Sequence, residues 1–87
     1  MENAVNLWNC SIHLDPTAAV RPGTLARICG VFAERDISIE SISAGNSTTE
    51  AWVLLVFTAS PSIADEIRSS LMSLSNARKV NLAAGQV

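Results

Sequence analysis

Apolar and polar residues alternate in two stretches near the ends of the chain, a pattern typical of half-buried β-strands. The first stretch runs from Asn6 to Leu14, and a shorter one runs from Arg78 to Leu82. Between them, Ala51 to Thr58 has large apolar side chains on both faces. A continuous apolar run of this length predicts a central strand that is covered on both sides.

A fourth strand is expected from Asp36 to Ala44, where the alternation changes phase. Ile37 and Ile39 share one face of this strand, whereas Ile42 falls on the other. Either a β-bulge or an outer face that meets another subunit would explain the change. The polar residues Gly45 to Glu50 then predict a turn that joins this strand to the next as a hairpin.

Two segments repeat apolar residues every three or four positions, as amphipathic helices do. The first runs from Gly23 to Arg35, and Pro22 suits its start. The second follows Ser60, which is a good helix cap, and Pro61, which suits the first helical position. The apolar positions of the second helix are Ile63, Ile67, Leu71 and Leu74.

The resulting order, β-α-β-β-α-β, predicts an α+β fold of the ferredoxin-like kind. Right-handed crossovers place both helices on one face of a four-stranded antiparallel sheet. The first and third strands are then central, and the second lies at an edge. We expect a single domain over residues 1–82 and a flexible C-terminal tail over residues 83–87.

This fold leaves one face of the sheet without helices, although its third strand is apolar on both faces. The open face carries one of two sets of three large side chains: Trp52, Leu54 and Val56, or Val53, Leu55 and Phe57. A monomer rarely exposes such a patch. We therefore expect either a homodimer or docking onto a larger subunit.

Composition and charge exclude several classes of function. The 87 residues suffice for one small domain, and their net charge of −2 cannot supply the basic surface that nucleic acids or anionic membranes require. The longest apolar run, Ala51 to Phe57, is too short to span a bilayer. The N-terminal residues lack the pattern of a signal peptide, so a cytoplasmic protein is expected.

The sequence offers little material for catalysis. Cys10 and Cys29 have no Cys-x-x-Cys context, and His13 is the one histidine, so both cysteines are interpreted as small buried apolar residues. His13 and Asp15 are close enough on a strand for a general base, but a solvated histidine at a strand end explains them better. Carboxylates are dispersed and no glycine-rich phosphate loop occurs. We expect no enzymatic activity, no cofactor and no metal.

The junction from Val20 to Leu25 is the strongest local signal for a binding site. Gly23 permits a close backbone approach where a strand leads into a helix start. Backbone N–H groups at such a start accept a carboxylate well, as of a small amino acid. The same residues could equally form only a tight loop.

Three runs in this region resemble the ACT domain: RPGTLARI at 21–28, GVFAER at 30–35 and ISIESI at 37–42. Among ACT domains they are most similar to the regulatory small subunit of acetohydroxyacid synthase (acetolactate synthase), in a short single-domain form. The resemblance covers these runs closely and the rest of the chain only in the order and hydrophobicity of its elements.

The resemblance implies a regulatory, non-catalytic subunit. ACT domains pair side by side through edge elements and bind amino acids at the interface, here a branched-chain effector. The matching effector-binding positions are Val20, Arg21, Pro22, Gly23, Thr24 and Leu25 of one subunit, with Ser38, Ile39, Glu40, Ser41 and Ile42 of its partner. Such a small subunit docks on a thiamine-diphosphate-dependent catalytic subunit, activates it and often confers feedback inhibition.

Two positions depart from the family pattern. Val20 and Ser38 each stand where the family usually has asparagine, so polar contacts to an amino acid are lost or shortened. Arg21 could offset this by pairing with the ligand carboxylate, or it could equally be a solvated loop arginine. A subunit that activates its partner without sensing an amino acid would also fit these departures. One alternative is a free-standing ACT-domain amino-acid sensor that regulates a different enzyme, a transporter or a transcription factor. A small ferredoxin-like enzyme or metal carrier is a further alternative, disfavoured by the missing Cys-x-x-Cys and the lone histidine.

Overall fold

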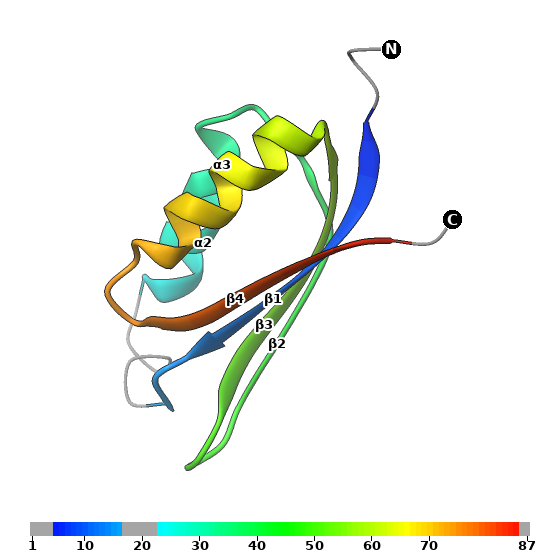
Figure 1. Ribbon diagram of the computed structural model, residues 1–87. Coiled ribbons are helices and arrows are strands. Elements are labelled where there is room, and N and C mark those ends of the chain that lie inside the picture. The colour runs from blue at the N-terminus through cyan, green and yellow to red at the C-terminus, as the bar shows by residue number, and fades with distance from the viewer. Residues whose placement is uncertain (1–4, 17–22, 86–87) are drawn as a thin grey trace.

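The computed structural model, which describes residues 5–16 and 23–85, has the predicted order of elements. The elements are β1 (Asn6–Leu14), α2 (Thr24–Ala33), β2 (Ile39–Asn46), β3 (Ala51–Ala59), α3 (Pro61–Met72) and β4 (Ala77–Ala84). The strands form one antiparallel sheet in the order β2-β3-β1-β4, and both helices cover the same face of it (Figure 1). The ferredoxin-like fold is thus confirmed, with β1 and β3 central and β2 at an edge.

The hydrophobic core lies between this sheet and its two helices. Phe57 of β3 is fully buried and meets the ring of Phe32 of α2 edge to face, with centroids 4.9 Å apart. Burial of aliphatic side chains from both central strands and both helices completes this core. The largest of them are Ile12, Ile28, Leu55, Ile67 and Leu71.

The opposite face of the sheet has no helix over it in the described part of the chain. Of the two apolar sets on β3, the one formed by Trp52, Leu54 and Val56 lies on this open face. Leu54 is 46% exposed there, whereas Leu55 beside it is 1% exposed. The alternation of β3 alone did not show which of its two apolar faces would be buried. The face with Phe57 is buried because Phe57 packs against Phe32 of α2.

The phase change in the second strand is a β-bulge. The register between β2 and β3 shifts between Ile39, which pairs with Phe57, and Ser41, which pairs with Val56. Two residues of β2 are therefore used where β3 advances by one residue. As a result, the side chains of β2 beyond the bulge alternate in the opposite phase. The strand begins at Ile39, three residues later than expected, because Asp36 belongs to the turn that ends α2.

Helix α2 ends two residues earlier than its apolar pattern suggests. The Ile37 N–H donates to the Phe32 carbonyl over 3.0 Å, and the Asp36 N–H donates to the Ala33 carbonyl over 3.1 Å. These two bonds form a Schellman motif, which requires a left-handed residue after the helix. Asp36 provides it with a φ of 60°, a conformation that is easier for glycine.

Replacing Asp36 with glycine is therefore expected to stabilise the protein by about 0.5–1 kcal/mol, a rise in melting temperature of about 3–6 °C. The gain arises because glycine has no Cβ to clash in the left-handed region. A thermal melt of the purified variant measures it. Asp36→Ala keeps the Cβ and should show no rise; an unchanged melting temperature for Asp36→Gly would contradict the prediction.

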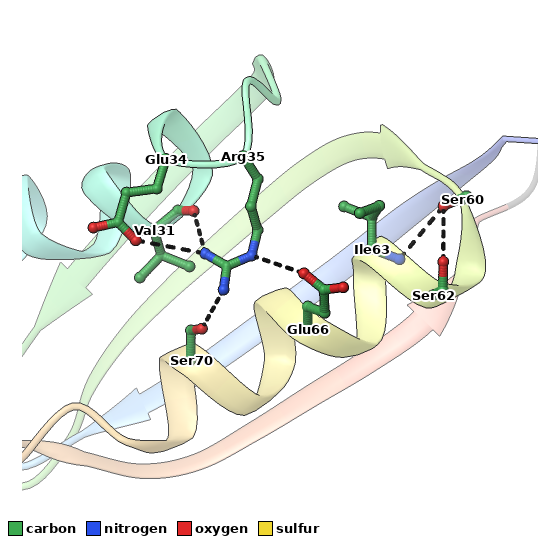
Figure 2. Close-up of polar contacts among 8 residues, drawn as sticks. All are labelled: Val31, Glu34, Arg35, Ser60, Ser62, Ile63, Glu66 and Ser70. Atoms are coloured by element: carbon green, nitrogen blue, oxygen red, sulfur yellow. Dashed lines mark hydrogen bonds and ion pairs between the residues drawn. The ribbon is translucent and has the colours of Figure 1, made fainter.

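Arg35 joins the end of α2 to α3 (Figure 2). Its Nη1 donates to the Val31 carbonyl over 3.1 Å, and its Nη2 donates to Ser70 Oγ over 2.8 Å. Its Nε lies 3.5 Å from a carboxylate oxygen of Glu66 as an ion pair without hydrogen-bond geometry. Arg35 thus adds polar contacts between the two helices to their shared hydrophobic core.

The predicted start of α3 is confirmed. Ser60 Oγ accepts a hydrogen bond from the Ile63 N–H over 3.4 Å (Figure 2). Pro61 is the first helical residue. This arrangement satisfies one of the N–H groups that a helix start leaves without a partner.

The last strand is longer than expected. β4 continues two residues past Leu82, and the Gly85 N–H donates to the Leu7 carbonyl over 2.6 Å. The first residues of the expected tail, 83–87, are therefore paired with β1, while residues 86 and 87 lie outside the described residues. The end of β4 is determined by its pairing with β1. The side-chain pattern did not predict it, because alanine has a low preference for β-strands and two alanines follow Leu82.

None of the helices in the part of the chain that the structure describes is both long and apolar enough to cross a membrane.

Candidate functional site

A cavity of about 300 Å³ opens where the start of α2 meets the ends of three strands. This volume lies at the lower end of the range for small-molecule sites, about 300–1,000 Å³. The lining combines apolar side chains with a few polar ones and contains no charged residue of the described chain. Its members are Leu14, Thr24, Leu25, Ala44, Gly45, Asn46, Trp52 and Val53.

The start of α2 contributes Thr24 and Leu25 to this cavity. Gly23 precedes them with a φ of 92° and provides no side-chain cap, and its carbonyl accepts the first helical bond, from the Arg27 N–H. The left-handed conformation favours glycine at this position. The N-terminal end of a helix carries partial positive charge and favours an anionic group close to it.

Asn76 fixes the base of this helix start from the other side of the fold. Its side-chain amide donates to Thr24 Oγ1 over 3.4 Å, and its carbonyl accepts from the Asp15 N–H over 3.1 Å. Thr24 is 5% exposed, so its hydroxyl is held inside the protein. The residue thus ties the end of β1 to the first turn of α2.

Trp52 also borders the cavity and lies directly across from Gly45 in the β2–β3 ladder, with its side chain on the open face of the sheet. A Cβ added at Gly45 would overlap the ring carbons Cζ2 and Cε2 of Trp52, so the indole lies flat against the backbone of this glycine. Only a residue without a side chain allows this approach. This pair was not predicted from the sequence, because Gly45 was expected in the turn, whereas β2 continues through Asn46.

The predicted effector-binding residues are divided by the structure. Thr24 and Leu25 line the cavity, and Gly23 adjoins it, whereas Val20, Arg21 and Pro22 lie outside the described residues. The second group lies along the edge strand, away from the cavity of its own chain: Ser38 just before β2, and Ile39, Glu40, Ser41 and Ile42 within it. A single chain therefore does not bring the two groups together; Ala44, Gly45 and Asn46, further along β2, take that place.

The residues considered for catalysis do not form a reactive arrangement. His13 is exposed on β1, and Asp15 pairs with Arg78 at 3.7 Å. Burial raises the pKa of the Cys10 thiol to about 11, so this cysteine stays protonated at neutral pH, and Cys29 is a half-buried free thiol. No cluster of three or more potential metal ligands occurs among the described residues.

Comparison with known proteins identifies the family. The model of the ACT domain matches residues 21–68, more than half of the 87 in the chain. No curated protein sequence matched. ACT domains are typically regulatory modules that bind amino acids.

Solved structures agree with this fold. The ACT domain of GTP pyrophosphokinase from Chlorobium tepidum superposes with a TM-score of 0.73 at 14% identity, covering 94% of this chain and 90% of that one. The regulatory subunit of aspartate kinase from Thermus thermophilus gives 0.63 at 20% identity, covering 92% and 53%. A homoserine dehydrogenase from Thiobacillus denitrificans gives 0.74 at 19% identity, and the match covers 95% of this chain but only 18% of the dehydrogenase. The chain belongs to the ACT domain family.

Proposed function

We propose that this protein is a non-catalytic regulatory subunit that binds a small amino acid at the start of α2. The observation that carries the proposal is the cavity of about 300 Å³, which the first residues of α2 line together with the β2–β3 hairpin. A helix start beside an apolar cavity suits a ligand with a carboxylate at one end and a hydrocarbon side chain at the other.

The lining of the cavity favours a branched-chain amino acid. Leu14, Leu25 and Val53 offer aliphatic contacts in this lining. No charged side chain of the described lining is available to pair with a polar or charged ligand side chain. Burying an unpaired charge is costly, so an aliphatic effector fits this cavity better than an acidic or basic one.

A second subunit at the edge of the sheet would complete the site. Leu25 and Ile42 are each 45% exposed, although both are large and apolar, and β2 is an unpaired edge strand. Side-by-side pairing through β2 would cover these side chains and bring Ser38 to Ile42 of one subunit towards the α2 start of the other. Such a dimer would place the second group of predicted residues where the family resemblance implies that they lie.

The catalytic partner we propose is the thiamine-diphosphate-dependent subunit of acetohydroxyacid synthase. The support for it is the likeness of the runs at 21–28, 30–35 and 37–42 to that regulatory small subunit. Regulation would couple effector and catalytic sites by about 1–3 kcal/mol. A free-standing sensor of another enzyme, a transporter or a transcription factor is the alternative, and an activity assay with the catalytic subunit, with and without this chain, separates the two.

A thermal melt against a panel of amino acids tests the binding site. A branched-chain effector at a hundred times its Kd should add about 2.7 kcal/mol of stability, which corresponds to about ten degrees or more for a domain this small. Amino acids with charged side chains should give no comparable shift. The proposal fails if none of the panel shifts the melt of the wild-type protein.

Leu25→Asp locates the binding within this cavity. The added carboxylate would repel the ligand carboxylate, and Leu25 is exposed enough for the fold to survive, so the shift should disappear. Met72→Asp is the matched control, because Met72 is 41% exposed on α3 and lies outside the cavity. A shift that persists in Leu25→Asp would place the effector elsewhere. Gly23 is unsuited to this test, because any side chain is strained at its φ of 92°.

A further inference from the structure

Asn46, the last residue of β2, lines the cavity at the start of α2 and is exposed to solvent. It pairs with Ala51 of β3, which in turn pairs with Leu14 of β1. Directly paired residues direct their side chains to the same face of a sheet, and both Ala51 and Leu14 are buried in the core. The Asn46 side chain therefore lies on the helix-covered face of the sheet, at the solvent side of the cavity.

The turn after β2 holds Asn46 in place without using its side chain. The Ser47 N–H donates to the Glu50 carbonyl over 2.7 Å, and Ser47 Oγ accepts from the N–H groups of Thr49 and Glu50 over 3.3 and 3.1 Å. The Asn46 amide forms no hydrogen bond or ion pair with any residue that the structure describes. Its oxygen and its N–H groups are therefore free to contact a ligand.

An amino acid bound in this cavity needs an acceptor for its ammonium group. The lining has no charged side chain in the described chain, and two of its side chains contain an oxygen atom, those of Thr24 and Asn46. Thr24 Oγ1 already accepts a hydrogen bond from the Asn76 amide over 3.4 Å, and Thr24 is 5% exposed. Asn46 Oδ1 is thus the side-chain acceptor in this lining that a ligand can reach.

We propose that Asn46 Oδ1 accepts a hydrogen bond from the α-ammonium group of the effector. This inference rests on the proposed function, in which the start of α2 takes the carboxylate and the aliphatic lining takes the hydrocarbon side chain. Each of the three groups on the α-carbon then has its own partner in the cavity. Asn46 thereby makes the site selective for α-amino acids over carboxylic acids with the same carbon skeleton.

Isothermal titration calorimetry with two pairs of probes tests this selectivity. The pairs are L-valine with 3-methylbutanoate and L-leucine with 4-methylpentanoate, and in each pair the second acid lacks the ammonium group. Wild-type protein should bind the amino acid of a pair at least about tenfold more tightly than the deaminated acid. The reason is that a hydrogen bond from a charged donor is among the stronger ones in proteins.

Substitutions at Asn46 assign this preference to its side chain. Asn46→Ala should weaken binding of the amino acid by at least about tenfold and leave the deaminated acid unaffected. Asn46→Asp keeps an acceptor and adds a negative charge, so it should bind the amino acid more tightly than Asn46→Ala does, and the deaminated acid more weakly. Asn81→Ala is the matched control, because Asn81 is an exposed asparagine of β4 outside this cavity. A melt of each variant without ligand verifies that it is folded.

The proposal is overturned if wild-type protein binds both members of each pair equally, or if Asn46→Ala keeps the wild-type preference. In either case the proposed function still stands, provided that wild-type protein binds the amino acids and Leu25→Asp does not. If no amino acid shifts the melt of the wild-type protein, the proposed function and this inference fail together.

Discussion

Replacing Phe57 with alanine is expected to lower the free energy of unfolding by about 3–5 kcal/mol. Phe57 is fully buried at the centre of the core, and its ring meets Phe32 edge to face at 4.9 Å. Removing it leaves a cavity and removes the ring contact between β3 and α2. A small domain has about 5–15 kcal/mol of stability in total, so the variant would be marginally folded. Urea denaturation followed by far-ultraviolet circular dichroism measures the loss.

Thr58→Ala is the control for this substitution. Thr58 is the next residue of β3, but its side chain lies on the open face and is exposed, so its replacement should cost about 0.5 kcal/mol or less. A loss below about 1 kcal/mol for Phe57→Ala would contradict the core described here.

The core was predictable because hydrophobic periodicity follows from burial. The alternation in β1 placed Cys10, Ile12 and Leu14 on one face, and all three are buried in the structure. The alternation in β3 left the choice of face undecided, since both of its faces are apolar. The packing of the helices determines which face of β3 is buried. This follows from the contact of Phe57 with Phe32, which neither segment reveals by itself.

The ends of elements were less predictable because backbone bonds set them. The helical pattern continues through Glu34 and Arg35, but α2 ends earlier, where the left-handed Asp36 closes the Schellman motif. Pairing with β1 similarly carries β4 through Ala83 and Ala84. The side chains of Ala83 and Ala84 do not indicate that the strand continues, and the side chain of Asp36 does not indicate that the helix ends.

Half of the candidate site was visible in the sequence and half was not. Thr24 and Leu25 belong to a recognisable run at a helix start, whereas the pairing of Gly45 with Trp52 depends on hairpin register. The turn fixes that register through a hydrogen bond from the Ser47 N–H to the Glu50 carbonyl over 2.7 Å. The cross-strand pair follows once the turn is known, but the polar sequence of the turn allows more than one length.

Adding a single methyl group at Gly45 tests this pair. Gly45→Ala is expected to lower the free energy of unfolding by about 1–3 kcal/mol, because the new Cβ overlaps the indole of Trp52 and the ring must move. Gly45 itself lines the cavity, so a shift of its backbone should weaken the amino-acid-induced shift of the melt as well. Urea denaturation gives the stability, and near-ultraviolet circular dichroism reports the changed environment of the indole.

Gly30→Ala adds the same methyl group in α2, where nothing lies within 4 Å of the new Cβ. It should raise stability by about 0.5–1 kcal/mol, since alanine favours a helix over glycine. In the double variant Gly45→Ala with Trp52→Ala, the clash is absent, so the loss should be smaller than the sum of the two single losses. Additive losses, or an unchanged indole signal in Gly45→Ala, would show that Trp52 does not lie against Gly45. The opposite signs expected for the same methyl at two glycines arise because the indole fills the space beside one of them and the other faces open space.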